Sequence, residues 1–245
     1  LTYFVENPTN ILETESFKSG DFTVQDVGSI LTGEVLAPKE NSKVLDIGCG
    51  TGRHLLEFSK FTSYVTGTDI SSKMLDYAKE KLKNVREAKF VHGNWMKNFT
   101  KEKEFDLVFA SMTPAISKIE HIKRMCLISK NYCMMERFVY YRDPIREEIE
   151  KMLGRKLNKL HSNHKEYTYG LWNIVWNLGY FPEIYLDKYI SETEKTVIDY
   201  MEQIICTDDE ENKIIEFLKG KEKKGKIMSK EYIIKAVILW DVNIF

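Results

Sequence analysis

Three glycines at alternate positions, preceded by an acid, are the residues of this sequence best suited to binding chemistry. Gly48, Gly50 and Gly52 follow Asp46, and a segment of helical period begins at Arg53. Glycines let the chain reverse sharply and let a ligand approach the backbone closely. The helix that follows would present N–H groups and a partial positive charge, which suit a carboxylate or a phosphate. This stretch therefore predicts a site for a nucleotide-like ligand.

The spacing of this loop separates two kinds of ligand. A dinucleotide site with the pattern G-x-G-x-x-G/A would place a small residue at position 53, where this chain has Arg53. The negative charge of Asp46 would repel a pyrophosphate, but its carboxylate can accept hydrogen bonds from an ammonium group. Another nucleotide-binding α/β protein is the alternative interpretation of Asp46 and the glycines.

Further polar residues follow three later β-rich runs. Asp69 lies 19 residues beyond Gly50, where a carboxylate can accept hydrogen bonds from both ribose hydroxyls. Asn94 and Trp95 follow the next run, and they could pair with the edge of an adenine and cover its face. Ser111 begins the loop after the fourth run. Ligands bind at the carboxyl ends of parallel strands, so we expect these loops to meet at one site.

From residue 41 onward, short β-rich runs alternate with segments of helical period, which predicts a parallel sheet covered by helices. The expected strands span 43–47, 64–70, 89–92, 105–110, 132–140, 183–190 and 233–242. The expected helices span 53–61, a segment from the N-cap Ser71 to Asn84, 116–128, 193–205 and 210–218. The segment 144–180 is expected to be a helical insertion, and 219–226 a charged turn or loop.

Val44–Gly52, Val65–Met74 and Phe105–Phe109 together resemble the class I S-adenosylmethionine-dependent methyltransferases. The resemblance covers about residues 41–140. It implies an α/β, Rossmann-like three-layer sandwich with a seven-stranded, mostly parallel sheet and an antiparallel last strand. It also implies a single methyltransferase domain over 1–245, with 41–140 as the cofactor-binding half. We expect 1–40 and 144–180 to be helical cap or lid elements, because there the chain departs from the shared core.

The resemblance also assigns residues to the cofactor, S-adenosyl-L-methionine, and to its product, S-adenosyl-L-homocysteine. Asp46 and the glycine loop would cradle the methionine moiety, and Asp69 would hold the ribose hydroxyls. Asn94, where many members have Asp, would receive the adenine amino group, and Trp95 would flank the ring. The full expected set, in which Ile70 and Met74 lie beside the ribose or adenine, is Asp46, Gly48, Cys49, Gly50, Gly52, Asp69, Ile70, Met74, Asn94, Trp95 and Ser111.

Methyl transfer requires mainly that a nucleophile be held about 3 Å from the methyl carbon and that water be excluded. A general base is needed only where the nucleophile carries a proton that must leave. We therefore assign no catalytic residue, and no metal ligand. The loop Ser111–Pro114 differs from the Asn/Asp-Pro-Pro-Tyr/Phe tetrad of enzymes that methylate amino groups of nucleic acids and proteins. Ser111, Thr113 and Tyr140 are the expected substrate contacts.

Several of these residues also have a purely structural interpretation. Trp95 is favoured as packing over a dedicated stacking partner, and Met74 is most simply a core residue with one end near the cofactor. His161 and His164 have a spacing that could ligate a metal on one helical turn, but a polar surface is favoured because no third ligand stands out. The aromatic residues at helical spacing in 167–180 are favoured as core over a substrate box.

The composition excludes few classes of function. Among 245 residues, 36 Lys plus Arg oppose 37 Asp plus Glu, which gives no overall attraction to nucleic acid or to an anionic membrane. Four cysteines without a C-x-x-C pair indicate a reducing compartment, and no run suits a signal peptide or a membrane span, so we expect a cytoplasmic protein. The expected function is methyl transfer to a small molecule. The alternatives are an RNA or protein methyltransferase and a non-catalytic cofactor-binding protein, and the oligomeric state stays open.

Overall fold

The sheet order confirms the predicted fold class. The computed structural model describes residues 15, 40–158 and 165–243, and the chain divides into two compact units between Cys133 and Met134. The seven strands follow the order β3-β2-β1-β4-β5-β7-β6. Neighbouring strands from β1 to β4 pair in parallel, whereas β7 runs antiparallel to β6. This is the Rossmann-like α/β arrangement with an antiparallel last strand, while a single domain over 1–245 stays a prediction.

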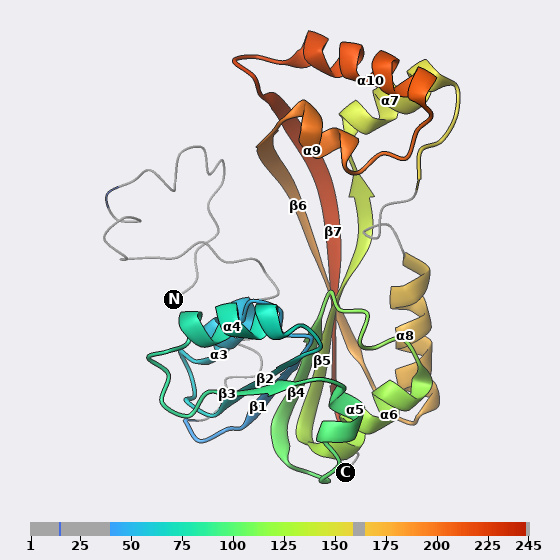
Figure 1. Cartoon of the computed structure of the whole chain (residues 1–245). Coiled ribbons are helices and arrows are strands. Elements are labelled where there is room, and N and C mark those ends of the chain that lie inside the picture. Colours follow the sequence, from blue (N-terminus) through green and yellow to red (C-terminus); the bar gives the residue numbers. More distant parts are fainter. Residues whose placement is uncertain (1–14, 16–39, 159–164, 244–245) are drawn as a thin grey trace. The chain divides into compact units, whose positions relative to one another are not determined.

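The first unit is built around β1, whose four residues are all buried. Figure 1 shows α3 and α4 on one face of its strands, with α5 and α6 on the side away from them. Among the helices that the structure describes, none has the length and apolar character of a membrane span. In chain order the elements of this unit are β1 (Val44–Ile47), α3 (Arg53–Phe58), β2 (Val65–Asp69), α4 (Ser72–Lys81), β3 (Lys89–His92), α5 (Trp95–Asn98), β4 (Phe105–Ser111), α6 (Ile119–Ile128) and the start of β5 (Ser129–Arg142).

Helix α4 begins where the sequence predicts, but it does not bury the residue expected in the core. The Ser71 hydroxyl accepts a hydrogen bond from the Met74 backbone N–H at 3.3 Å, which caps the helix. Leu75, Ala78 and Leu82 are buried at helical spacing. Met74 lies outside this stripe and is 41% exposed, so its assignment to the core is wrong.

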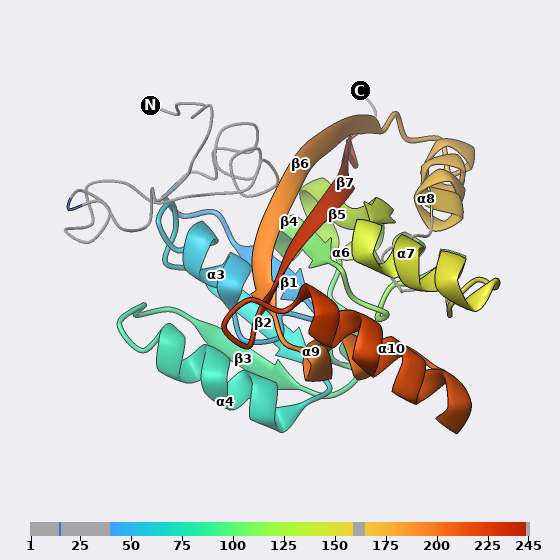
Figure 2. The same cartoon turned by 90° about the horizontal axis from the view of Figure 1, so that it is seen from above.

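The second unit contains a long antiparallel hairpin of β6 and β7 (Figures 1 and 2). Helices α7, α9 and α10 gather at the end where β6 stops and β7 begins, around a small apolar core: Ile145, Ile149, Leu157, Tyr200, Ile204, Ile214, Leu218 and Ile227. After β5, the elements of this unit are α7 (Pro144–Leu153), α8 (Lys165–Asn177), β6 (Glu183–Lys195), α9 (Val197–Met201), α10 (Asp208–Lys221) and β7 (Ile227–Asp241).

The hairpin is longer than the sequence predicts at both of its inner ends. A helix was expected from Thr193, but β6 continues to Lys195 and α9 begins only after the N-cap Thr196. The polar residues of this stretch pair across the hairpin: Glu192 with Lys230 at 3.4 Å, and Glu194 with Lys226. Opposite charges on facing strands stabilise a sheet. Their partners lie far along the chain, so the local pattern resembles a helix start.

Helices α7 and α8 confirm the helical prediction over 144–153 and 165–177, although the aromatic residues of α8 are arranged differently from the expectation. The buried side of α8 consists of Thr168, Leu171 and Val175. The assignment of the aromatic residues to the core is wrong for Tyr167, Tyr169 and Trp176, because each is more than half exposed. The candidate metal pair, His161 and His164, lies outside the described residues. The role of this segment as a lid stays a prediction.

Five elements of the second unit meet at one ammonium group. Lys195 pairs with Glu231 of β7 and lies 3.9 Å from the carboxylate of Asp143, which caps α7, and 5.0 Å from the centre of the Tyr200 ring in α9. The Tyr141 hydroxyl at the end of β5 donates to Glu231 at 2.6 Å. Burial and then this hydrogen bond raise the pKa of Tyr141, which keeps the phenol protonated as a donor. Lys195 therefore joins the helices to the strand ends.

Replacing Lys195 by methionine should strongly destabilise the protein. Two buried carboxylates would lose their shared cation, and breaking such a pair costs about 3–5 kcal/mol of unfolding free energy. Urea unfolding followed by circular dichroism measures the loss. The matched control is Lys188→Met on the same strand, where the side chain is exposed and a change within about 0.5 kcal/mol is expected. Equal losses in the two variants would contradict the role of Lys195.

Candidate cofactor site

The glycine loop after β1 turns through the left-handed region at three positions. The φ angles of Gly48, Gly50 and Gly52 are 72°, 52° and 75°, and L side chains rarely adopt such angles. The loop stays attached to β2, because the backbone N–H groups of Gly48 and Cys49 donate to the Thr68 carbonyl at 2.8 and 3.1 Å. Gly52 is the N-cap of α3. The loop therefore has the shape that the sequence predicts.

The three glycines border different surroundings. A Cβ atom added to Gly48 would lie 2.2 Å from Oγ1 of Thr113, and one added to Gly52 would lie 2.9 Å from Leu82 of the first unit. Among the residues that the structure describes, none lies within 4 Å of where a Cβ atom on Gly50 would lie. Gly48 and Gly52 thus permit close packing. Gly50 faces open space, and it is the point where a ligand can reach the backbone.

The carboxylate of Asp69 ties the glycine loop to the loop after β2. One of its oxygens accepts a hydrogen bond from the Gly50 backbone N–H at 2.9 Å, and the other accepts one from the Ser71 N–H at 2.9 Å. Each carboxylate oxygen has a further lone pair. Asp69 can therefore hold both loops and still accept hydrogen bonds from the hydroxyls of a ligand.

Two carboxylates give the glycine loop a negative electrostatic potential. The Cys49 pKa is raised first by burial of the thiol, then by the negative charge of Asp46, and then by that of Asp69. Asp46 is only 1% exposed. The thiol of Cys49 consequently stays protonated and acts as a small buried side chain rather than as a nucleophile. The same field favours a ligand that carries positive charge.

The two predicted residues of the loop after β3, Asn94 and Trp95, have different surroundings. The side-chain carbonyl of Asn94 accepts a hydrogen bond from the Met96 N–H at 2.9 Å and so caps α5, a helix that the sequence did not predict. Trp95 is buried, and its indole N–H donates to the Ala115 carbonyl at 3.3 Å. These contacts support the packing interpretation of Trp95. Its position beside an adenine, like that of Asn94, stays a prediction.

Two apolar side chains next to Asp69 face solvent. Ile70 is 78% exposed, and Met74 at the start of α4 is also exposed. The Ile70 carbonyl accepts a hydrogen bond from a ring nitrogen of His92 at 3.0 Å, which fixes the backbone here. Exposed apolar groups beside an acid suit a ligand with a ring and a sugar, as the prediction for these residues requires.

The loop after β4 packs directly against the glycine loop. Thr113 is buried against Gly48, and its hydroxyl accepts a hydrogen bond from the Ala115 N–H at 3.2 Å. Ser111 is half-buried at the end of β4. Met112 has a φ of 47°, which sequence reasoning missed because methionine has no preference for this conformation. Tyr140 belongs to β5 in the second unit, and its contact with substrate stays a prediction.

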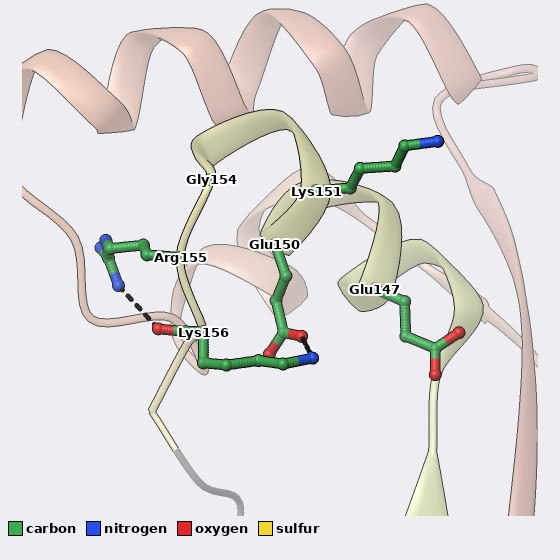
Figure 3. A pocket seen from close by; sticks show the side chains of 6 residues that line it. All are labelled: Glu147, Glu150, Lys151, Gly154, Arg155 and Lys156. Carbon is green, nitrogen blue, oxygen red and sulfur yellow. Dashed lines mark hydrogen bonds and ion pairs between the residues drawn. The ribbon is translucent and has the colours of Figure 1, made fainter.

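A separate cavity of about 500 Å³ lies in the second unit, at the end of α7 (Figure 3). Four of the five charged side chains that line it form ion pairs with one another or with nearby residues. Lys156 pairs with Glu150 at 2.7 Å, and Arg155 donates to Glu210 at 2.7 Å. Its lining is Glu147, Glu150, Lys151, Gly154, Arg155 and Lys156. Because these pairs satisfy most of its charges, this cavity is a weaker candidate than the glycine loop.

A family model matches part of the first unit. The family model of the methyltransferase domain matches residues 44–127, which include the glycine loop, Asp69 and the loop after β4. Residues 44–127 belong to the methyltransferase domain family. The predicted membership of the class I S-adenosylmethionine-dependent methyltransferases is confirmed for this part of the chain.

Solved structures share the fold of the methyltransferase domain at low sequence identity. A putative methyltransferase from Bacillus halodurans C-125 is 13% identical, with a TM-score of 0.57, and the match covers 88% of this chain and 98% of that chain. A SAM dependent methyltransferase from Aquifex aeolicus is 15% identical, with a TM-score of 0.50, over 94% of this chain and 99% of that chain. Both support the Rossmann-like arrangement.

A curated relative matches this chain over a short stretch. A demethylmenaquinone methyltransferase from Staphylococcus aureus (strain JH9) is 38% identical over 73 residues, which is 29% of this chain. The chain spans about 30% of the length of the curated relatives it matches. The likeness is therefore local.

The glycines should differ in what an added methyl group does. Gly48→Ala should lower the free energy of unfolding far more than Gly50→Ala, because only the first forces a clash with Thr113. Gly50→Ala should lose about 1–2 kcal/mol of stability from its left-handed backbone, together with most of the affinity for S-adenosylhomocysteine. Thermal unfolding and calorimetry measure the two effects.

The control for the glycine variants is Gly220→Ala in α10, where the added Cβ has no described residue within 4 Å and φ is ordinary. It should be neutral or stabilising by about 0.5–1 kcal/mol. If Gly50→Ala bound S-adenosylhomocysteine as tightly as the unchanged chain, the open space at Gly50 would not be the ligand site.

Proposed function

We propose that this chain is an S-adenosylmethionine-dependent methyltransferase that acts on a small-molecule acceptor. The observation that carries the proposal is the open backbone at Gly50, whose N–H donates to Asp69, next to Cys49, where the negative charges of Asp46 and Asp69 both act. The family match over residues 44–127 supports the same activity. That match does not include the second unit, so the activity of the whole chain is proposed here.

The residues of the loop fit S-adenosyl-L-methionine in their chemistry. The cofactor carries a sulfonium and an ammonium group, and the negative field around Cys49 favours both. Asp46 would hold the ammonium side of the methionine moiety, and Asp69 would accept hydrogen bonds from the ribose hydroxyls. A pyrophosphate would meet two carboxylates here. These two carboxylates, which accept hydrogen bonds and carry negative charge, therefore suit this cofactor better than a dinucleotide.

In the proposed reaction the protein positions groups rather than supplying a nucleophile. When bound, the cofactor supplies an activated methyl group, which the acceptor atom attacks in line while the carbon–sulfur bond breaks and its electron pair stays on sulfur. Asp46 and Asp69 fix the donor, and the loop from Ser111 to Thr113 would orient the acceptor. A base is required only for an acceptor atom that must lose a proton. S-adenosyl-L-homocysteine is the second product.

Several observations support a small molecule as the acceptor. The net charge of −1 gives no general attraction to nucleic acid. The loop Ser111–Pro114 lacks the tetrad of enzymes that methylate amino groups of nucleic acids and proteins. The curated relative named above carries a small-molecule acceptor in its name. All four cysteines are free thiols, which supports a reducing, cytoplasmic setting. Residues 1–40 and 144–180 would form the lid that excludes water.

Titration calorimetry with S-adenosylhomocysteine tests the donor half of the proposal. Asp46→Asn and Asp69→Asn should each weaken binding about tenfold or more, because each removes one negative charge from the site. Asp76→Asn is the control, since that carboxylate lies on the exposed side of α4. No heat of binding to the unchanged chain, with no thermal shift, would refute the proposed function.

Transfer of labelled methyl groups to fractionated cell extract separates the acceptor classes. A small-molecule methyltransferase labels the small-molecule fraction. An RNA or protein methyltransferase labels the macromolecular fraction. A non-catalytic binding protein gives a calorimetric signal without any transfer of label. The Asp46→Ala variant serves as the inactive control in each fraction.

A further inference from the structure

One residue beside the glycine loop has a strained backbone. Within the described ranges, the non-glycine residues with positive φ are Lys103 at 49°, Met112 at 47° and Lys224 at 55°. Lys103 lies in the turn before β4, and Lys224 precedes Gly225 in the tight turn before β7. Met112 instead lies in the loop after β4, directly before Thr113, which packs against Gly48. A non-glycine residue in this conformation costs about 1–2 kcal/mol.

The neighbour of Met112 explains why the strain persists. The Thr113 side chain fills the space beside Gly48, with three of its atoms within 2.2–3.1 Å of where a Cβ of Gly48 would lie. The Thr113 hydroxyl also accepts the Ala115 N–H. Thr113 is thus fixed from both sides, while Ser111 still belongs to β4. Met112, between them, must make the change of direction.

We propose that Met112 determines acceptor specificity and contacts the acceptor next to its reacting atom. This inference rests on the proposed function. Strained residues persist where the surroundings over-determine them, and they cluster at ligand sites. Glycine would relieve the strain at this position, whereas the methionine retains a flexible, polarisable thioether there. Such a group suits an acceptor with an apolar or aromatic group beside its nucleophilic atom.

Thr113 takes the role of a positioning residue in this arrangement. Its side chain lies against Gly48 of the glycine loop, and its hydroxyl is engaged within its own loop. Any shift of the glycine loop at Gly48 therefore reaches Met112 through the next residue along the chain. The contact couples the loop proposed to hold the donor to the residue proposed to hold the acceptor.

A pair of substitutions at position 112 tests the strain without any activity assay. Met112→Gly should unfold about 2–4 °C above Met112→Ala, because only the alanine is strained there. Lys103→Gly against Lys103→Ala is the matched control and should show the same order. A Met112→Ala variant that is as stable as Met112→Gly would overturn the argument from strain.

Methyl transfer to the small-molecule fraction of cell extract tests the role of Met112. Met112→Gly and Met112→Ala should transfer label about tenfold more slowly, while their affinity for S-adenosylhomocysteine changes less than about threefold (about 0.6 kcal/mol). Lys103→Gly should change neither quantity. Thr113→Ala should slow transfer as well, with its affinity for S-adenosylhomocysteine measured alongside.

The outcomes separate this inference from the proposed function. Equal rates of transfer by the unchanged chain and by Met112→Gly would overturn the role of Met112 and leave the methyltransferase proposal standing. Absence of both binding and transfer in the unchanged chain would overturn the proposed function, and this inference with it. A loss of S-adenosylhomocysteine affinity in Met112→Gly that matched its loss of rate would assign the residue to the donor site and refute its role in specificity.

Discussion

The hydrogen bonds of one carboxylate hold the candidate site together. Asp69 accepts the backbone N–H groups of Gly50 and Ser71, which belong to loops after two different strands. The contact of Thr113 with Gly48 joins the loop after a third strand to the same point. Three loops that are separate in sequence therefore share one rigid arrangement. Its shape requires glycine at position 48 for packing and leaves Gly50 facing open space.

The residues of this site could be predicted because local rules determine their positions. Parallel strands end at a common edge, so an acid at each strand end and a glycine turn between them must lie near one another. Asp46, Asp69 and the glycines follow this rule, and the structure places them together around Cys49. The N-cap at Ser71 is equally local, since it depends on a side chain and an N–H three residues away.

The features that sequence reasoning missed depend on contacts between distant residues. The polar ends of β6 and β7 form strands because charges 36 residues apart, such as Lys195 and Glu231, pair across the hairpin. The left-handed Met112 follows from the packing of Thr113 on a loop more than sixty residues earlier. Three aromatic residues of α8, Tyr167, Tyr169 and Trp176, are exposed because Leu171 and Val175 already form its buried side. No local pattern encodes these choices.

The cluster around Lys195 also has a consequence for the order of folding. Its members come from β5, α7, β6, α9 and β7, so the cluster closes only after chain segments far apart in sequence have met. Closing such loops costs entropy before any contact repays it. The ammonium and its two carboxylates lose water only when all are in place. We therefore expect α7 and α9 to attach to the hairpin late in folding and to detach from it early in unfolding.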